Sequence, residues 1–350
     1  MENDFLLEIK DQPSALKRCI ASLSSKNSEE IYTNISSSLK NGKFKQVIFT
    51  GMGSSYFVSQ AAASILASYK ITSFAINSAE LLHYQYPIID GRTLLVCISQ
   101  SGESYEVVEL LKKIKSSPVV VGITNDENSF LAHHCQFCLQ CRAGEEKMTS
   151  TKSFITTYLA AYVLSLRLAE KSIDWKELSK VHASLDAILN ESIDRAGEYV
   201  KFLGEANFIQ VIARGTDLAT ASQTALMFME ATKTSSSAML GAEFRHGPLE
   251  VVDKKFISII YSHSCSETHA QIWHLINDIL NFGGKVILIT DKKTKVENKN
   301  ILQIEVECGN PDLFLIPSII PSQILVNEYA GKKGIVPGNF IHGAKVTKIE

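Results

Sequence analysis

The chain has 350 residues, of which 45% are hydrophobic and 21% are charged, and its formal net charge is −2 at pH 7. This length accommodates one large domain or two of ordinary size. The near-neutral charge argues against nucleic acid as the main partner, because proteins that bind the phosphate backbone carry a surplus of basic residues. A phosphate-bearing ligand would have to be held locally, by hydroxyl groups, backbone amides and a helix end.

The first residues carry acidic side chains before any apolar stretch, so they do not resemble a signal peptide. No uninterrupted apolar run approaches the ~20 residues that span a bilayer. The seven cysteines are an odd number, which fits a reducing compartment. We therefore expect a cytoplasmic protein without a membrane segment.

Residues 1–40 are predicted to form N-terminal helices, and residues 41–170 a first α/β domain. In that domain, apolar runs rich in β-branched residues alternate with helical stretches, which is typical of a parallel sheet covered on both faces. The elements expected in order are strand 46–50, helix 61–67, strand 94–98, helix 105–114 and strand 119–124.

The chain then repeats this order. Connecting helices are expected over 171–197, followed by a second α/β domain over 198–330 and a glycine-rich tail over 331–350. The elements expected in the second domain are strand 209–213, helix 219–231, strand 256–262 and strand 285–290. The repetition predicts two α/β subdomains of related design.

The segment Ser99–Ser104 joins the second expected strand to an amphipathic helix and reads Ser-Gln-Ser-Gly-Glu-Ser. Small hydroxyl side chains and unpaired backbone N–H groups meet at such a helix start, where the helix dipole favours an anion. The sequence therefore predicts a phosphate-binding loop. At the matching place in the second domain, Ser262–Ser266 keeps hydroxyl groups but has no glycine that permits close backbone approach, so we expect no second phosphate site.

Cys135, Cys138 and Cys141 form a C-x-x-C-x-x-C motif preceded by two histidines. Such a motif can indicate zinc, but the sequence offers no second cluster that would complete a tetrahedral ligand set. We expect a strand over 135–139, on which residues three apart face opposite sides. The motif is therefore predicted to be structural, without a metal.

Glu230 lies on the helix predicted for 219–231, on one face with Gln223 and Met227 at positions i, i+4 and i+7. A carboxylate on a mostly buried face is costly unless it is paired or used, and burial raises its pKa toward the range of a general base. The alternative is a helix-end glutamate paired with Lys233 or with solvent.

His246 lies in an Arg-His-Gly-Pro turn. Such a histidine is either a hydrogen-bonded structural residue or a functional group, and a constrained turn on a rigid scaffold favours function. Lys345 lies near the end of the sequence, where most lysines are simply solvated.

Together these motifs resemble the tandem sugar isomerase (SIS) family, most closely the isomerase half of glucosamine-6-phosphate synthase (glutamine–fructose-6-phosphate transaminase) and the single-function glucosamine-6-phosphate deaminases. The matching motifs are Glu8-Ile9 with Gln12-Pro13, Gly53-Ser54-Ser55, Ser99–Ser104, Glu146-Lys147 with Ser150–Phe154, Glu243–Pro248 and Lys345-Val346-Thr347. The resemblance implies an α/β fold of two tandem SIS subdomains, each a flavodoxin-like three-layer unit with a parallel sheet, with a helical N-terminus and a C-terminal tail.

By resemblance, the first subdomain holds the sugar phosphate. The implied phosphate ligands are Ser55, Ser99, Gln100, Ser101 and Ser104. Ser150 is implied to line the sugar site, although the residues alone also allow it to cap the helix that starts near Lys152.

The resemblance also implies the reacting groups. Glu230 corresponds to the glutamate that moves a proton between C1 and C2 of the open-chain sugar, and His246 to the histidine that opens the ring from the neighbouring subunit. A homodimer is therefore implied, with Arg245 and Glu243 near its interface. Lys345 corresponds to a lysine of the tail that folds over the substrate, excludes water and stabilises charge on a sugar oxygen.

The chain departs from the synthase in its first residues and on one helix. It has Glu at position 2 and no glutaminase half, so glutamine-dependent synthesis within this polypeptide is not expected. Gln223 and Met227 stand where the synthase has a glutamate and a lysine, which leaves the substituent on C2 of the sugar open.

The expected function is isomerisation and deamination of an amino sugar 6-phosphate: glucosamine 6-phosphate to fructose 6-phosphate and ammonia, or the reverse. No metal or redox cofactor is expected, because the adjacent carbonyl or iminium acidifies the proton. Two alternatives stay open: a deglycase of a phosphorylated sugar–amine adduct, and a sugar-phosphate sensor without turnover. Neither a DNA-binding segment nor a basic surface bias is evident, and three reacting groups are retained, which favours catalysis over sensing.

Overall fold

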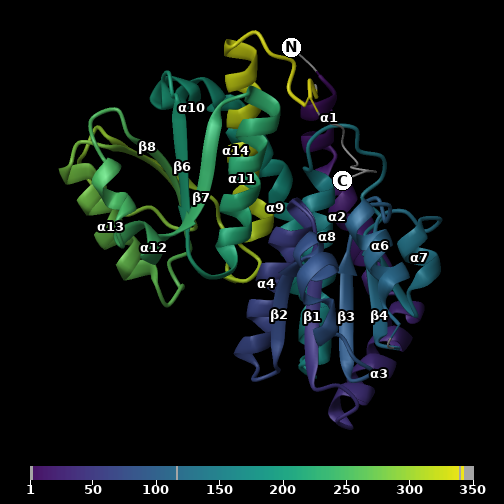
Figure 1. Ribbon diagram of the computed structural model, residues 1–350. Coiled ribbons are helices and arrows are strands. Elements are labelled where there is room, and N and C mark those ends of the chain that lie inside the picture. Colours follow the sequence, from purple (N-terminus) through teal and green to yellow (C-terminus); the bar gives the residue numbers. More distant parts are fainter. Residues whose placement is uncertain (1–2, 116, 339, 343–350) are drawn as a thin grey trace. The chain divides into compact units, whose positions relative to one another are not determined.

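The computed structural model describes residues 3–115, 117–338 and 340–342 (Figure 1). By its internal contacts the chain divides into two compact units. We call Asp11–Glu146 with Ser150–His182 the N-module, and Ala183–Phe340 with Lys147–Thr149 and the first ten residues the C-module. Each module is described by itself.

The N-module contains a five-stranded parallel sheet in the order β2-β1-β3-β4-β5. Its strands are β1 (Gln46–Gly51), β2 (Ser73–Asn77), β3 (Thr93–Ile98), β4 (Val119–Thr124) and β5 (Phe137–Gln140). Its helices are α2 (Gln12–Leu23), α3 (Lys26–Lys40), α4 (Ser54–Ser68), α5 (Ser78–Glu80), η1 (Leu81–Gln85), η2 (Tyr86–Ile88), α6 (Tyr105–Lys113), α7 (Phe130–His134) and α8 (Lys152–Leu168).

Both faces of this sheet are covered, which explains the continuous apolar strands. Register pairs Phe49 with Val96, and Val96 with Val121, so the three central strands align their apolar residues. Alternate residues such as Leu95 lie in a buried cluster with Val107 of α6, while α4 packs against α8. Burial on both faces suits Val, Ile and Leu throughout, because neither side meets water.

The C-module repeats this plan, with a parallel sheet in the order β10-β9-β8-β6-β7. Its strands are β6 (Phe208–Ala213), β7 (Ser235–Leu240), β8 (Ile257–Ser262), β9 (Lys285–Thr290) and β10 (Ile301–Glu305). Its helices are α1 (Asp4–Lys10), α10 (Ala196–Leu203), η3 (Gly215–Asp217), α11 (Leu218–Thr232), α12 (Gly241–Arg245), η4 (Pro248–Val251), α13 (His269–Asn281) and α14 (Leu315–Lys332). Helix α9 (Trp175–Asp194) carries the chain from the first module into the second.

Read from its β7 edge, the second sheet has the order β7-β6-β8-β9-β10, which matches β2-β1-β3-β4-β5 strand for strand. The predicted repeat of α/β units is therefore confirmed. The core strands lie within a residue of their predicted bounds. The prediction that Cys135 lies on a strand is wrong: the residue ends α7, and β5 begins two residues later. Within the described ranges, no helix is both long and apolar enough to cross a membrane.

Candidate functional site

The carboxyl ends of β1 and β3 are neighbours in the N-module, and the chain leaves them in opposite directions. From β1 it passes through α4 to β2 on one side, and from β3 through α6 to β4 on the other. Open α/β sheets bind ligands at such a reversal of strand order, in the crevice outside the strand ends. The predicted phosphate-binding loop, Ser99–Ser104, lies here, directly after β3.

Hydrogen bonds fix the shape of this loop. The hydroxyls of Ser99 and Ser104 lie 3.0 Å apart, and Ser99 Oγ accepts the N–H of Gly102 at 3.1 Å. Ser101 Oγ accepts the N–H of Glu103 at 3.2 Å. Ser99 is buried, whereas Ser101 and Ser104 are partly exposed, so the loop presents hydroxyl groups from a rigid base.

Helix α6 begins at this loop without a side-chain cap. Ser104 is its N-cap residue and has extended backbone angles, yet its hydroxyl makes no capping bond. No capping side chain therefore takes the first N–H groups of α6, and the helix dipole favours a negative charge in front of them. This is the arrangement that a phosphate requires.

The start of α4 lies against the end of β3. A Cβ atom on Gly51 would lie 2.8 Å from Ser55 Cβ and 2.9 Å from the carbonyl oxygen of Ile98, so only glycine permits this approach. It places Ser55 beside the first residue of the loop. The predicted phosphate ligands that the structure brings to this edge are Ser55, Ser99, Gln100, Ser101 and Ser104.

The segment that supports the loop from β4 was not predicted from the sequence. The carbonyl of Gln100 accepts the N–H of Asn125 at 3.0 Å and the hydroxyl of Thr124 at 3.2 Å. Glu103 accepts the N–H of Phe130 at 2.6 Å, at the start of α7. The signal was a polar Thr-Asn-Asp cluster after an apolar strand, which marks the same sheet edge.

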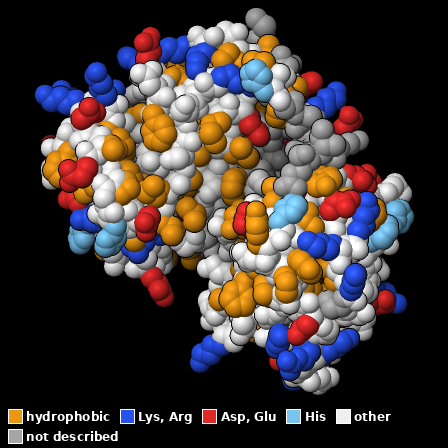
Figure 2. Space-filling model, in the orientation of Figure 1, with side chains coloured by type: hydrophobic (Ala, Val, Ile, Leu, Met, Phe, Trp, Pro, Cys, Tyr) orange, Lys and Arg blue, Asp and Glu red, His pale blue; other side chains and the backbone are white. Residues whose placement is uncertain are grey.

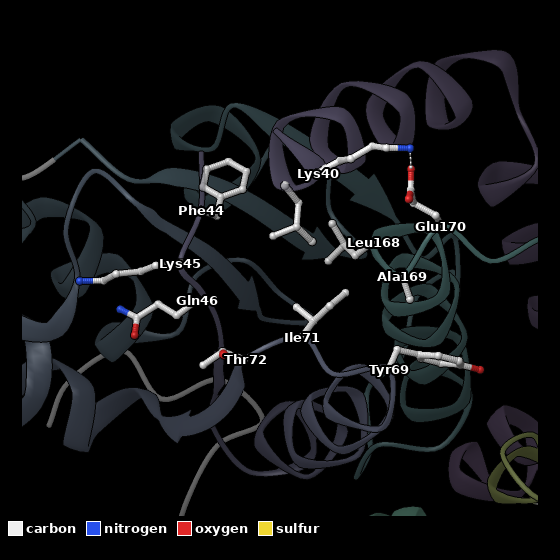
Figure 3. A pocket seen from close by; sticks show the side chains of 11 residues that line it. Lys40, Phe44, Lys45, Gln46, Tyr69, Ile71, Thr72, Leu168, Ala169 and Glu170 are labelled. Carbon is white, nitrogen blue, oxygen red and sulfur yellow. Dashed lines mark hydrogen bonds and ion pairs between the residues drawn. The ribbon is translucent and has the colours of Figure 1, made fainter. Parts of the chain in front are cut away.

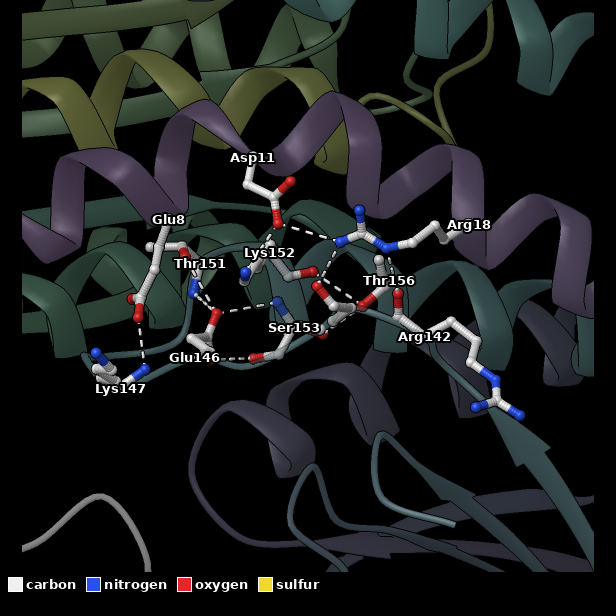
Figure 4. A network of polar contacts seen from close by, with 12 residues as sticks. Glu8, Asp11, Arg18, Arg142, Glu146, Lys147, Thr151, Lys152, Ser153 and Thr156 are labelled. Carbon is white, nitrogen blue, oxygen red and sulfur yellow. Dashed lines mark hydrogen bonds and ion pairs between the residues drawn. The ribbon is translucent and has the colours of Figure 1, made fainter.

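Ser150 is half-buried and does not cap α8. The N-cap residue is Thr151, and the capping group is the buried carboxylate of Glu146 (Figure 4). Glu146 accepts the N–H groups of Thr151 and Ser153 at 2.9 and 3.1 Å and also both of their hydroxyls. The alternative role considered for Ser150, a helix cap, is therefore wrong, and its role at the sugar stays a prediction.

Lys152 is buried and pairs with Asp11. Its Nζ lies 2.8 Å from Asp11 Oδ2, and Arg18 contacts the same oxygen at 3.1 Å (Figure 4). Burial raises the pKa of Asp11, but the hydrogen bonds from Lys152 and Arg18 outweigh it and hold the pKa below its usual value. This ion pair joins α8 to the residue before α2.

In the C-module, Glu230 lies in the last turn of α11 and is partly buried. Gln223 and Met227, on the same helical face, are fully buried, as the sequence pattern predicted. Lys233 follows as a left-handed C-cap residue (φ +54°), and its Nζ donates to the carbonyl of Glu230 at 2.5 Å. The carboxylate of Glu230 therefore lies at the edge of the buried face.

His246 is exposed and forms the C-cap of α12. Its N–H donates to the carbonyl of Glu243 at 3.0 Å, which closes the turn. Arg245 pairs with Asp278 of α13 at 2.7 Å. The imidazole thus stands on a short, braced turn at the surface of the C-module.

Glu230 and His246 lie at opposite ends of β7. Glu230 ends the helix that precedes this strand, and His246 follows the short helix after it. Six extended residues span about 20 Å, so within one chain the two groups do not reach the same pair of atoms. Lys345, the third predicted reacting residue, lies outside the described residues.

The switch point of the C-module differs chemically from that of the N-module. Asp291, after β9, accepts both the N–H and the hydroxyl of Ser264, each at 2.5 Å. Asp217, at the turn after β6, is buried, and burial with the nearby carboxylates of Asp312 and Asp291 raises its pKa to about 8. The carboxylate of Asp291 thus takes donors of the loop after β8, and the absence of a second phosphate site stays a prediction.

One surface hollow of about 400 Å³ lies at the opposite edge of the N-module sheet (Figure 3). Its lining includes Gln46, the first residue of β1, and Thr72, the residue before β2, so it lies at the amino ends of these strands. The Lys40–Glu170 ion pair also lines it. Ligands of open α/β sheets bind at the carboxyl ends. This hollow is therefore separate from the candidate site.

Comparison with known proteins identifies the family. The model of the SIS domain matches residues 43–167 and 202–323. The chain belongs to the SIS domain family. Two matched regions agree with the two modules and the two parallel sheets.

Curated relatives are glutamine–fructose-6-phosphate aminotransferases (isomerizing). That of Pyrococcus horikoshii is 26% identical over 360 residues, and that of Francisella tularensis is 28% identical over 355 residues. The alignments cover 100% and 94% of this SIS chain but 58% and 56% of the relatives. The chain thus spans less than three fifths of their length.

Solved structures share the fold. The C-terminal domain of glucosamine-fructose-6-phosphate aminotransferase from Francisella tularensis superposes with a TM-score of 0.85 at 24% identity, covering 97% of this chain and 98% of that one. Glucosamine-6-phosphate deaminase from Thermotoga maritima gives 0.76 at 23% identity, with 99% of both chains covered. Tagatose-6-phosphate ketose/aldose isomerase from Escherichia coli gives 0.81 at 19% identity, with 97% and 96% covered.

Proposed function

We propose that the chain is an enzyme that isomerises a phosphorylated sugar, and that it deaminates an amino sugar 6-phosphate. The observation that carries the proposal is the loop Ser99–Ser104 at the switch point of the N-module, where hydroxyls and the uncapped start of α6 converge. The names of the relatives share a sugar 6-phosphate as reactant. An anchored phosphate leaves the other end of the sugar for chemistry.

In this proposal Glu230 transfers the proton. The hydrogen on C2 of open-chain glucosamine 6-phosphate is acidified by the aldehyde at C1. Glu230 removes it to give an enolamine and returns it to C1, which leaves an imine at C2 that water hydrolyses to fructose 6-phosphate and ammonia. Partial burial of Glu230 supports this role, because a desolvated carboxylate is a stronger base. Lys345 would stabilise the charge that develops on oxygen.

His246 would open the sugar ring from a second copy of the chain. Ring opening breaks the bond between C1 and the ring oxygen, so His246 and Glu230 must act at neighbouring atoms. Their placement at opposite ends of β7 in one chain supports a contribution across a homodimer interface. Exposed apolar side chains, including Tyr84 at 76% and Phe74 at 47%, offer surface for a dimer to cover, and Figure 2 shows such side chains over both modules.

Deuterium exchange tests the proposal directly. The protein is incubated in deuterated water with glucosamine 6-phosphate or fructose 6-phosphate and ammonium, and deuterium at C1 and C2 is followed together with ammonia. Exchange with ammonia release identifies a deaminase, and exchange without it an isomerase. Binding without exchange would refute catalysis on these sugars and leave a deglycase or a sensor.

The variant Glu230→Gln should abolish exchange while it preserves binding of the sugar phosphate. The matched control is Glu205→Gln, which changes an exposed glutamate of the same module in the loop before β6. Its exchange rate should equal that of the unaltered protein. Exchange at the full rate in Glu230→Gln would exclude Glu230 as the base.

A further inference from the structure

Two cysteine thiols lie side by side at the edge strand of the N-module. Cys138 lies in β5, and Cys135 ends α7 where the chain bends three residues earlier. The Cys135 thiol donates to the carbonyl of Ala132 at 3.6 Å and neighbours the Cys138 thiol. Both cysteines are free thiols.

Gly122 provides the space for this pair. It is the register partner of Cys138 in the neighbouring strand β4, and a Cβ atom on it would lie 2.9 Å from Cys135 Sγ. Every other residue of β4 is β-branched, which suits a buried strand, whereas a glycine weakens it. The missing side chain leaves room for the Cys135 thiol over the sheet, next to Cys138.

The surroundings distinguish the two sulfur atoms. The neighbouring Cys135 thiol, the hydrogen bond from Gln140 Nε2 (3.1 Å) and the charge of Arg142 lower the pKa of Cys138, against burial and the opposing charge of Glu127. The neighbouring Cys138 thiol and burial raise the pKa of Cys135. Cys138 is therefore the more acidic thiol of the pair, and the thiolate is the form of a cysteine that attacks an oxidant.

Cys138 can also be reached from solvent. It lines an open surface hollow of about 420 Å³ together with Arg18, Gln140 and Arg142. Access of this kind is one condition under which a cysteine reacts with an oxidant.

We propose that Cys135 and Cys138 form a redox-active dithiol that a peroxide converts to a reversible disulfide. The Cys138 thiolate attacks one oxygen of hydrogen peroxide; the O–O bond breaks, Cys138 becomes a sulfenic acid, and the released hydroxide takes a proton to leave as water. Cys135 Sγ then attacks Cys138 Sγ, the S–O bond breaks, and the second water leaves with the Cys135 proton. Two thiols and one hydrogen peroxide give one disulfide and two waters.

The test maps the cysteines of the unaltered chain after brief exposure to hydrogen peroxide, blocking of free thiols and proteolysis. We expect a peptide spanning residues 135–138 that is lighter by two hydrogens and that dithiothreitol restores. Free Cys138 should disappear about tenfold faster than Cys265, an exposed cysteine outside the motif that serves as the control.

Two variants separate the steps. Cys135→Ser should leave a sulfenic acid on Cys138 that dimedone traps, and Cys265→Ser should form the disulfide as the unaltered chain does. The proposal would be overturned if Cys135 and Cys138 both remained alkylatable after peroxide treatment that oxidises Cys265. Irreversible oxidation of Cys138 without a disulfide in the unaltered chain would also overturn it.

Discussion

Gly102 is the residue of the phosphate-binding loop whose replacement has the best-defined cost. Its φ of +66° lies in the left-handed region, and a Cβ atom on it would lie 2.0 Å from Ser129 Oγ and 2.4 Å from Ser129 Cβ. The left-handed conformation costs alanine about 1 kcal/mol. Overpacking a side chain into a filled space costs about 1–3 kcal/mol more. Gly102→Ala should therefore lower the free energy of unfolding by ~2–4 kcal/mol.

Gly42 supplies a matched control in the same module. Its φ is +70°, and a Cβ atom on it would meet nothing within 4 Å, so Gly42→Ala carries only the backbone cost of about 1 kcal/mol. The difference between the two variants, measured by urea unfolding at equilibrium, isolates the overlap with Ser129. A double variant, Gly102→Ala with Ser129→Gly, removes both overlapping atoms and should recover most of that difference, because glycine replaces serine at an N-cap for only a few tenths of a kcal/mol.

Ligand binding separates the loop's function from its stability. Calorimetric titration with fructose 6-phosphate should show weaker binding in Gly102→Ala, because the shifted loop moves the hydroxyls of Ser99 and Ser104, and unchanged binding in Gly42→Ala. Equal losses of stability in both variants would refute the packing argument. Full affinity in Gly102→Ala would refute the assignment of this loop to the phosphate.

Three further outcomes follow from the structure. The pKa of Asp217 is raised from 3.8 to about 8 in the folded chain, so the protonated group contributes stability in full below pH 3.8. This stability is lost at ~1.4 kcal/mol per pH unit as the pH rises toward 8. Asp217→Asn should remove this pH dependence from the free energy of unfolding, and an unchanged dependence would contradict the prediction. Glu146→Gln removes the charge that accepts the N–H groups of Thr151 and Ser153 and places an NH2 group against the Ser153 hydroxyl. Urea unfolding should therefore show a loss of about 1–3 kcal/mol, with exposed Glu145→Gln as a neutral control. Inactive Glu230→Gln and His246→Ala proteins, mixed and allowed to exchange subunits, should regain about a quarter of the activity if each site draws on both copies of a dimer; no recovery after confirmed exchange would place both groups in one chain.

The core strands of both modules could be predicted from the sequence. Short apolar runs rich in β-branched residues, such as Val119–Thr124, favour a buried strand over a helix when helical segments lie on either side of them. Three edge strands, Ser73–Asn77, Ser235–Leu240 and Ile301–Glu305, were not predicted. Polar residues shorten their apolar runs, and each pairs with only one neighbouring strand. The loop Ser99–Ser104 could be found because its chemistry is local. Its support from Thr124 and Asn125 could not, since only the sheet order brings the ends of β3 and β4 together.

The two modules show how one topology yields two different sites. In the N-module, hydroxyls of the loop after β3 accept N–H groups of the same loop, and α6 begins without a side-chain cap, where the proposed phosphate would accept hydrogen bonds. In the C-module, the loop after β8 gives the N–H and hydroxyl of Ser264 to Asp291, a carboxylate of the chain itself. A carboxylate of the chain at this edge repels a phosphate, although α13, like α6, begins without a side-chain cap. In the proposed function, the C-module contributes α11 and α12, which carry Glu230 and His246, rather than a second anchor.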